Sequence, residues 1–85
     1  MRGVEFHREK MWDKALGELD RTISLDPSYK EAYLLRGMIY YDRGSPEKAL
    51  RDFEKLYAMV SERRVKRGLQ KLIDEVKREI KGRNG

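Results

Sequence analysis

Residues 28–61 are Ser28-Tyr-Lys-Glu-Ala-Tyr-Leu-Leu-Arg-Gly-Met-Ile-Tyr-Tyr-Asp-Arg-Gly-Ser-Pro-Glu-Lys-Ala-Leu-Arg-Asp-Phe-Glu-Lys-Leu-Tyr-Ala-Met-Val-Ser61, and the architecture of the 85-residue chain can be worked out from them. Ser28 and Glu31 have the spacing of a capping box, which predicts a helix over 29–43. Gly44-Ser45-Pro46 ends that helix, because Gly suits the left-handed position after a helix, and Ser and Pro suit the start of the next. The segment therefore predicts two antiparallel helices, the second over 46–60.

The two helices of this hairpin differ in how their apolar residues are distributed. Residues 32–41 are apolar on nearly every side, which is typical of a helix that is covered on more than one face. The second helix has a single apolar stripe with charged residues opposite, made of Ala49, Leu50, Phe53, Leu56, Tyr57 and Val60. We therefore expect the first helix to be buried on two faces and the second on one.

The same pattern occurs a second time, 34 residues earlier in the chain. The identical pairs are Arg2/Arg36, Gly3/Gly37, Lys14/Lys48, Ala15/Ala49 and Leu16/Leu50, and the conservative pairs include Phe6/Tyr40, Leu19/Phe53 and Leu25/Met59. A fixed period of this length indicates stacked helical hairpins. Small residues such as Gly37 and Ala49 are expected to face each other where paired helices approach closely.

These residues resemble the tetratricopeptide repeat (TPR) family, whose 34-residue unit carries a W-x2-L-G-x2-Y, A-x3-F and final P pattern. Tyr33-x-x-Arg36-Gly37-x-x-Tyr40 and Ala49-x-x-x-Phe53 match it in register, and Pro27 closes the preceding unit. The departures are Arg36, Pro46 and Ser61, where the family usually has Leu, an aromatic residue and Pro. The resemblance covers residues 2–61 and implies an all-α, right-handed superhelix of antiparallel helix hairpins.

We expect one domain with about one and a half to two repeats and a C-terminal capping helix. Residues 1–27 are predicted to form a truncated first repeat, residues 28–61 a complete repeat, and residues 62–85 an amphipathic capping helix with a frayed tail after Lys81. The capping helix has one narrow apolar stripe and is otherwise polar, as the ends of repeat arrays require.

The first repeat can be interpreted as two helices or as one. A break near Lys10 would give helices over 1–9 and 12–25 and would return Phe6 to a core, because the apolar stripe of the second segment does not extend back to Phe6 in phase. This argument favours the break, although Lys10 stands where the second repeat has Gly44, and a left-handed Lys costs ~1 kcal/mol relative to Gly. A continuous helix over 1–25 is the alternative, and it would lead to a domain-swapped dimer.

Composition excludes several classes of function. The chain has no Cys and one His, which rules out disulfides and the usual zinc sites. No apolar run reaches ~18 residues, so we expect no membrane-spanning helix. The acidic residues Asp13, Glu18, Asp52 and Glu54 are expected on solvent-facing helical surface. With no nucleophile–base pair and no phosphate-binding loop, the sequence predicts that the protein is not an enzyme and has no cofactor or metal site. It also predicts a cytoplasmic location.

The TPR resemblance implies a binding surface on the inner, concave face, which the first helix of each repeat lines. The implied residues are Glu31, Leu34, Met38, Tyr41 and Asp42 in the complete repeat, and Val4, His7 and Arg8 in the truncated one. Leu34 and Met38 stand where some family members hold an acidic peptide terminus with a Lys/Asn clamp, so the expected ligand is apolar or amphipathic. Two uses stay open: a free groove for a protein or peptide partner, or a surface covered by the 62–81 helix or by a second copy. A homodimer is favoured because such arrays usually need about three repeats.

The net charge of +5 resides entirely in residues 61–85. The basic helix has three interpretations: a solvated back face, a nucleic-acid contact, or a contact with an acidic membrane surface or partner. The second would use Arg63, Arg64, Lys66, Arg67 and Lys71, but no aromatic residues are interleaved to stack bases. The sequence therefore predicts a protein-binding adaptor or scaffold, with a nucleic-acid- or acidic-surface-binding accessory protein as the alternative and a fragment of a longer array as a third interpretation.

Overall fold

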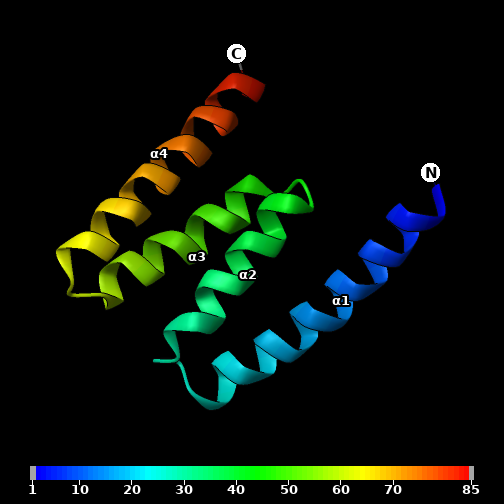
Figure 1. Cartoon of the computed structure of the whole chain (residues 1–85), viewed down its shortest axis with the longest axis horizontal. Helices are drawn as coiled ribbons and strands as arrows, with labels where there is room; N and C mark the ends of the chain where they lie inside the picture. Colours follow the sequence, from blue (N-terminus) through cyan, green and yellow to red (C-terminus); the bar gives the residue numbers. More distant parts are fainter. Residues whose placement is uncertain (1, 85) are drawn as a thin grey trace.

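The structure is a computed structural model that describes the backbone of residues 2–84 and the side chains of residues 11–82. It contains four helices, α1 (Arg2–Leu25), α2 (Lys30–Asp42), α3 (Pro46–Met59) and α4 (Arg63–Asn84). Each helix packs against the next one in the chain, so the four form a single row (Figure 1). The row is thin, with extents of 41 × 38 × 19 Å, and each pair of neighbours runs antiparallel. The predicted all-α architecture of antiparallel helix hairpins is confirmed.

The N-terminal helix α1 is continuous over 24 residues, so the predicted break near Lys10 is wrong. Residues 9–11 contain neither Gly nor Pro, and nothing local opposes continuation of the helix. The prediction of a break assumed that packing of Phe6 in a core would offset the free-energy cost of a left-handed Lys10. Because α2 has only 13 residues, α1 extends well beyond it, and in Figure 1 the N-terminal part of α1 diverges from α2.

The connection between α1 and α2 is organised by Asp26. Its Oδ1 accepts hydrogen bonds from the backbone N of Ser28 at 3.1 Å and from the Ser28 hydroxyl at 2.7 Å. The N-cap of α2 is Tyr29, without a side-chain bond, so the predicted capping box of Ser28 and Glu31 is wrong. A carboxylate two residues before Ser28 competes successfully for its hydroxyl. The Tyr33 hydroxyl donates to the Pro27 carbonyl at 2.8 Å and fastens the start of α2 to this connection.

The turn between α2 and α3 forms as predicted. Gly44 has a φ of 89°, in the left-handed region that favours glycine. The N–H of Ser45 donates to the Tyr40 carbonyl at 2.8 Å, and the N–H of Gly44 donates to the Tyr41 carbonyl at 3.1 Å, which together make a Schellman motif. Ser45 is the N-cap of α3 and Pro46 follows as its first residue.

The core follows α3, which lies between α2 and α4. One cluster of buried residues consists of Ala49, Phe53, Ile73 and Val76, and a second consists of Tyr33, Leu56 and Leu69. Gly37 lies against Phe53, since a Cβ added at Gly37 would be 2.6 Å from Phe53 Cε1. Gly37 therefore faces Phe53 rather than Ala49, one turn away on the same stripe of α3. As predicted, α2 is covered on two sides, by α1 and by α3.

The last helix, α4, packs Leu69, Ile73 and Val76 into the core and leaves its other faces polar and exposed. It continues to Asn84, so the frayed tail expected after Lys81 is wrong for residues 82–84. The reason is local: Lys, Arg and Asn tolerate a helix, and a single Gly82 lowers helix stability by only ~1 kcal/mol.

Candidate functional site

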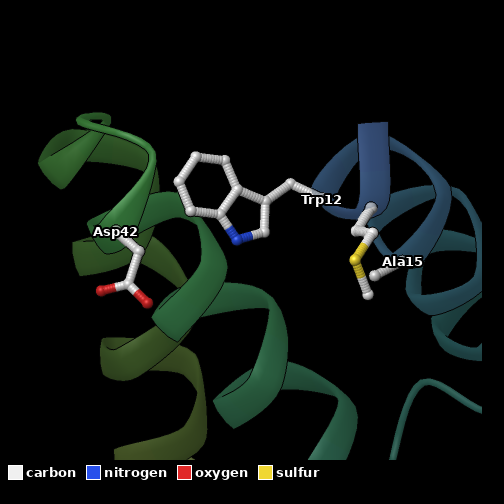
Figure 2. A pocket seen from close by; sticks show the side chains of 4 residues that line it. Trp12, Ala15 and Asp42 are labelled. Atoms are coloured by element: carbon white, nitrogen blue, oxygen red, sulfur yellow. The ribbon is translucent and has the colours of Figure 1, made fainter. Parts of the chain in front are cut away.

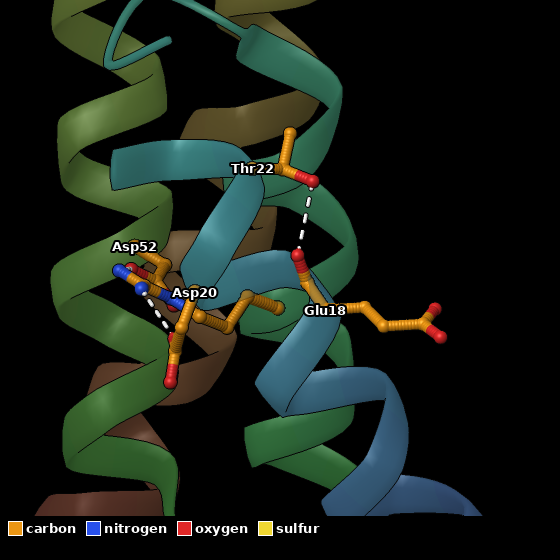
Figure 3. A network of polar contacts seen from close by, with 5 residues as sticks. Glu18, Asp20, Thr22 and Asp52 are labelled. Carbon is orange, nitrogen blue, oxygen red and sulfur yellow. Dashed lines mark hydrogen bonds and ion pairs between the residues drawn. The ribbon is translucent and has the colours of Figure 1, made fainter. Parts of the chain in front are cut away.

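An arginine joins three helices at the centre of the row. Arg36 on α2 donates from Nε to Asp52 Oδ2 at 2.9 Å and from Nη2 to Asp52 Oδ1 at 2.7 Å. Its Nη1 donates to Asp20 Oδ1 on α1 at 2.9 Å, as Figure 3 shows. Hydrogen bonds to Asp52 and to Asp20 raise the pKa of Arg36 above its ordinary value, and burial opposes them less strongly. The guanidinium thus holds α1, α2 and α3 together as a permanent cation.

This network corrects the sequence analysis at one position. The side chain of Asp52 is 6% exposed, so its expected place on solvent-facing surface is wrong. The signal was present in the sequence, because Arg36 and Asp52 are level with each other in an antiparallel hairpin that turns at residues 44–46. Arg36 stands where the family usually has Leu, and it supplies the cation of this ion pair.

A cleft opens where α1 and α2 separate. Asp13 on α1 and Arg43 after α2 form an ion pair, with Oδ1 and Nη1 2.8 Å apart. Beside it lies a cleft of about 650 Å³ that is lined by Met11, Trp12, Ala15 and Asp42. The indole of Trp12 points from α1 toward α2, with Asp42 on the opposite wall (Figure 2). Met11 is 70% exposed at its edge, so the cleft has an apolar wall that no described residue covers.

One face of α2 borders the cleft and is exposed to solvent. Three of the sequence-predicted site residues, Glu31, Met38 and Asp42, lie on it and are exposed. Leu35 shares this face, because residues at intervals of three and four are neighbours on a helix. Leu35 and Met38 are each 49% exposed. The face therefore has an apolar centre with a carboxylate at each end, and Leu35 is the member that the sequence analysis missed.

Two other predicted site residues belong to the core. Leu34 and Tyr41 are half-buried and pack against the cluster to which α4 contributes Ile73 and Val76. Of the two uses that the sequence left open for them, cover by the C-terminal helix is the one observed. The backbone of Val4, His7 and Arg8 lies in the N-terminal part of α1, and their side chains lie outside the described residues.

Tyr41 couples α2 to α4 and makes stability depend on pH. A hydrogen bond with Glu79 raises the pKa of the Tyr41 hydroxyl, and burial and the charges of Glu79, Glu75 and Asp42 act in the same direction. A pKa that is higher in the folded than in the unfolded state stabilises the protein below the ordinary value of ~10, and this contribution is lost as pH rises through the folded pKa. Above pH ~10 the free energy of unfolding should fall more steeply for the wild type than for Tyr41→Phe. Parallel urea titrations from pH 8 to about 11.5 would measure this, and equal slopes would contradict the Tyr41–Glu79 bond.

The basic charge of α4 is available at the surface. Arg63, Arg64, Arg67 and Lys71 of α4 are exposed to solvent. A hollow of about 290 Å³ between α3 and α4 is lined by Tyr57, Arg63, Lys66, Arg67 and Gln70, and the Lys66 ammonium lies 5.1 Å from the centroid of the Tyr57 ring. Within residues 11–82 no group of three potential metal ligands comes together. None of the helices, as far as the structure describes them, is long and apolar enough to cross a membrane.

Comparison with known proteins gives two relatives. "DnaJ homolog subfamily C member 7" from Homo sapiens is 36% identical over 56 residues, which are 66% of this chain and 11% of that protein. "Small glutamine-rich tetratricopeptide repeat-containing protein 2" from Saccharomyces cerevisiae is 38% identical over 47 residues, which are 55% of this chain and 14% of that protein. The matched part of the chain therefore spans only a small fraction of the length of either relative. No protein-family model matches the chain, and no solved structure matches it significantly.

Proposed function

The chain is distantly homologous to tetratricopeptide repeat proteins over most of its length, and on that premise we propose that the exposed face of α2 binds an amphipathic helix of a partner protein. The homology implies a protein–protein interaction module, and such repeats are typically not catalytic. We further propose a cytoplasmic location, in keeping with the absence of cysteine, and self-association through exposed apolar side chains such as Met11 and Met38.

The observation that carries the proposal is the composition of this face. Leu35 and Met38 expose apolar surface side by side, while α1 and α3 cover the other sides of α2. Met side chains adapt to differently shaped apolar partners. Glu31 and Asp42 stand at the two ends of the apolar surface and favour cations there. A matching ligand is a helix with one apolar stripe and Lys or Arg residues at its ends.

Met38 provides the sharpest test. The probes are two synthetic amphipathic helices of 13 residues, the length of α2, that differ only in carrying Lys or Glu at their ends. We expect the Lys-ended helix to bind more tightly in fluorescence anisotropy, and Met38→Glu to weaken its binding at least ~10-fold, because the substitution places a charge at the centre of the apolar contact. Val65→Glu is the matched control, since Val65 is an exposed apolar residue on α4, and it should bind as the wild type does.

Two results would contradict this site: no binding of either helix, or equal binding by Met38→Glu and the wild type. Leu34→Glu is unsuitable as a test, because Leu34 packs against the core and its substitution would unfold the protein. Circular dichroism should show the same helix content for Met38→Glu as for the wild type.

A second candidate function is the binding of nucleic acid by α4. It is favoured by the basic hollow beside Tyr57 and by the exposed Arg63, Arg64, Arg67 and Lys71 of α4. The two functions respond differently to salt. Five phosphate contacts with a single strand would lose about 130-fold in affinity between ~50 and ~200 mM salt, whereas an apolar helix contact changes little. The same titration with a single-stranded oligonucleotide in place of the peptide decides between them.

A further inference from the structure

The cleft between α1 and α2 has an aromatic wall and an acidic wall. The indole of Trp12 points from α1 across the cleft, and the Asp42 carboxylate stands on the opposite side at the end of α2 (Figure 2). An aromatic face attracts a cation through its quadrupole, and Trp does so most strongly. A carboxylate attracts the same cation by its charge and by accepting hydrogen bonds. A group that binds between these two walls should therefore be positively charged.

The carboxylate of Asp42 is available to such a group. The neighbouring carboxylate of Asp13 is already neutralised by Arg43, with Oδ1 and Nη1 2.8 Å apart. Asp42 is exposed and takes part in none of the ion pairs between described side chains. Because Asp13 offsets the positive charge of Arg43, that arginine leaves the attraction of Asp42 for a further cation in place.

The interior of the protein shows which cation suits an aromatic ring and a carboxylate together. The guanidinium carbon of Arg36 lies 5.8 Å from the centroid of the Tyr33 ring, while the same guanidinium donates to Asp52 at 2.9 and 2.7 Å. A planar guanidinium can do both, because its face packs on a ring while its edge donates hydrogen bonds, whereas the ammonium of Lys is a compact point charge. The cleft offers the same two kinds of partner, and no arginine is among the described residues that line it.

We propose that the cleft binds an arginine side chain of the partner helix, with its guanidinium between the Trp12 indole and the Asp42 carboxylate. Asp42 belongs both to the cleft and to the exposed face of α2, so a helix that lies on Leu35 and Met38 brings a residue at its end to the cleft. Met11, exposed at the edge, gives the methylene groups of that arginine an apolar surface. This inference rests on the proposed function and adds the identity of one ligand residue and the place that holds it, the arginine site.

The unaltered protein provides the first test, because Trp12 is the only tryptophan in the chain and its fluorescence reports on the cleft. The probes are two amphipathic helices of 13 residues, the length of α2, with blocked termini and no aromatic residues. They differ at one terminal residue, which is Arg in one helix and citrulline, its uncharged isostere, in the other. We expect the Arg helix to bind about 10-fold more tightly and to change the Trp12 emission on binding.

Two variants each remove one wall of the arginine site. Asp42→Asn and Trp12→Leu should each reduce the preference for Arg over citrulline from about 10-fold to at most ~3-fold, measured by anisotropy with a fluorophore at the other end of each probe. Both affinities are measured on the same variant, so partial unfolding weakens both probes alike and leaves their ratio unchanged. Glu18→Gln is the matched control. It removes one negative charge from the exposed surface of α1, outside the described lining of the cleft, and should keep the full preference.

The outcomes separate the arginine site from the proposed function. Equal binding of the two helices by the wild type overturns the arginine site alone, and so does a preference that persists undiminished in Asp42→Asn or in Trp12→Leu. An equal loss of preference in Glu18→Gln also overturns it, because the discrimination would then come from the overall charge of the protein. Failure of both helices to bind overturns the arginine site and the proposed function together.

Discussion

Gly37→Ala is expected to lower the free energy of unfolding by about 1–3 kcal/mol, although Ala is intrinsically the better helix former. The added methyl would lie 2.6 Å from Phe53 Cε1 and 2.9 Å from Cδ1, which is inside van der Waals contact. The Phe53 ring is 1% exposed and is held by the cluster with Ile73 and Val76, so it cannot turn aside without moving α4. The two central helices must therefore move apart.

The control for Gly37 is a glycine with free space around it. A Cβ added at Gly68 meets nothing within 4 Å, so Gly68→Ala should raise the free energy of unfolding by up to ~1 kcal/mol through helix propensity alone. Urea denaturation at one fixed protein concentration measures both variants. The clash also predicts a rescue: Phe53→Leu, the residue found at the counterpart Leu19, should cost less in the Gly37→Ala background than in the wild type. A Gly37→Ala variant as stable as Gly68→Ala would contradict the close approach.

Asp52→Ala should lower the free energy of unfolding by about 3 kcal/mol, the lower end of the range for breaking a buried ion pair. The substitution leaves the Arg36 guanidinium, whose side chain is 20% exposed, with only the Asp20 carboxylate as partner. The expected loss is at the lower end of this range because water still reaches part of the guanidinium and reduces the cost of leaving its charge unpaired. The loss arises from the unpaired charge rather than from the intrinsic strength of the ion pair.

Asp20 is the matched control for Asp52, because both carboxylates accept from the same guanidinium. Asp20 is 58% exposed, and Asp20→Ala should cost less than ~1 kcal/mol. The double variant Arg36→Leu/Asp52→Leu, which restores the family's usual Leu at residue 36, should recover most of the stability that Asp52→Ala loses, since it removes both buried charges. Equal effects of Asp52→Ala and Asp20→Ala in urea denaturation would show that burial does not govern this network.

The Arg36 network also matters for the cleft. It holds the C-terminal half of α1 against α2 through Asp20, while the N-terminal part of α1 diverges. The wall formed by Trp12 and Ala15 keeps its position relative to α2 only as long as α1 is held there. Variants of Arg36 should therefore change the shape of the cleft as well as lower stability.

Local chemistry was sufficient wherever a feature depends on neighbours in the sequence. The turn at residues 44–46 was predictable because a left-handed position, an N-cap and a first helical position each have their own preferred residue. The helix periodicity of α3 and α4 was predictable because each has one apolar stripe. The capping box at Ser28 was wrong because the carboxylates of Asp26 and Glu31 are both near enough in sequence to accept from the Ser28 N–H. The Asp26 carboxylate accepts it, and residue spacing alone does not show which acceptor is preferred.

Features that depend on a distant neighbour could not be predicted in this way. The break near Lys10 was inferred from the need of Phe6 for a core, whereas the backbone stays helical through residue 10. The rotation of α2 about its own axis could not be predicted from the sequence either. Leu34, Met38 and Tyr41 are close together on one helix, and only the position of α4 decides that Leu34 and Tyr41 are covered while Met38 faces solvent.

By itself, the sequence determined an all-α chain with a 34-residue period, the turn that separates α2 from α3, and the stripe by which α4 attaches, because these follow from backbone preferences and helical spacing. Only the tertiary structure decided that α1 is one continuous helix and that Asp52 is buried against Arg36. It also decided which residues line the cleft, namely Met11, Trp12, Ala15 and Asp42, and that Leu35 and Met38 are exposed on α2. These features depend on how neighbouring helices are rotated and how far each extends, and those quantities are set by packing between residues far apart in the chain.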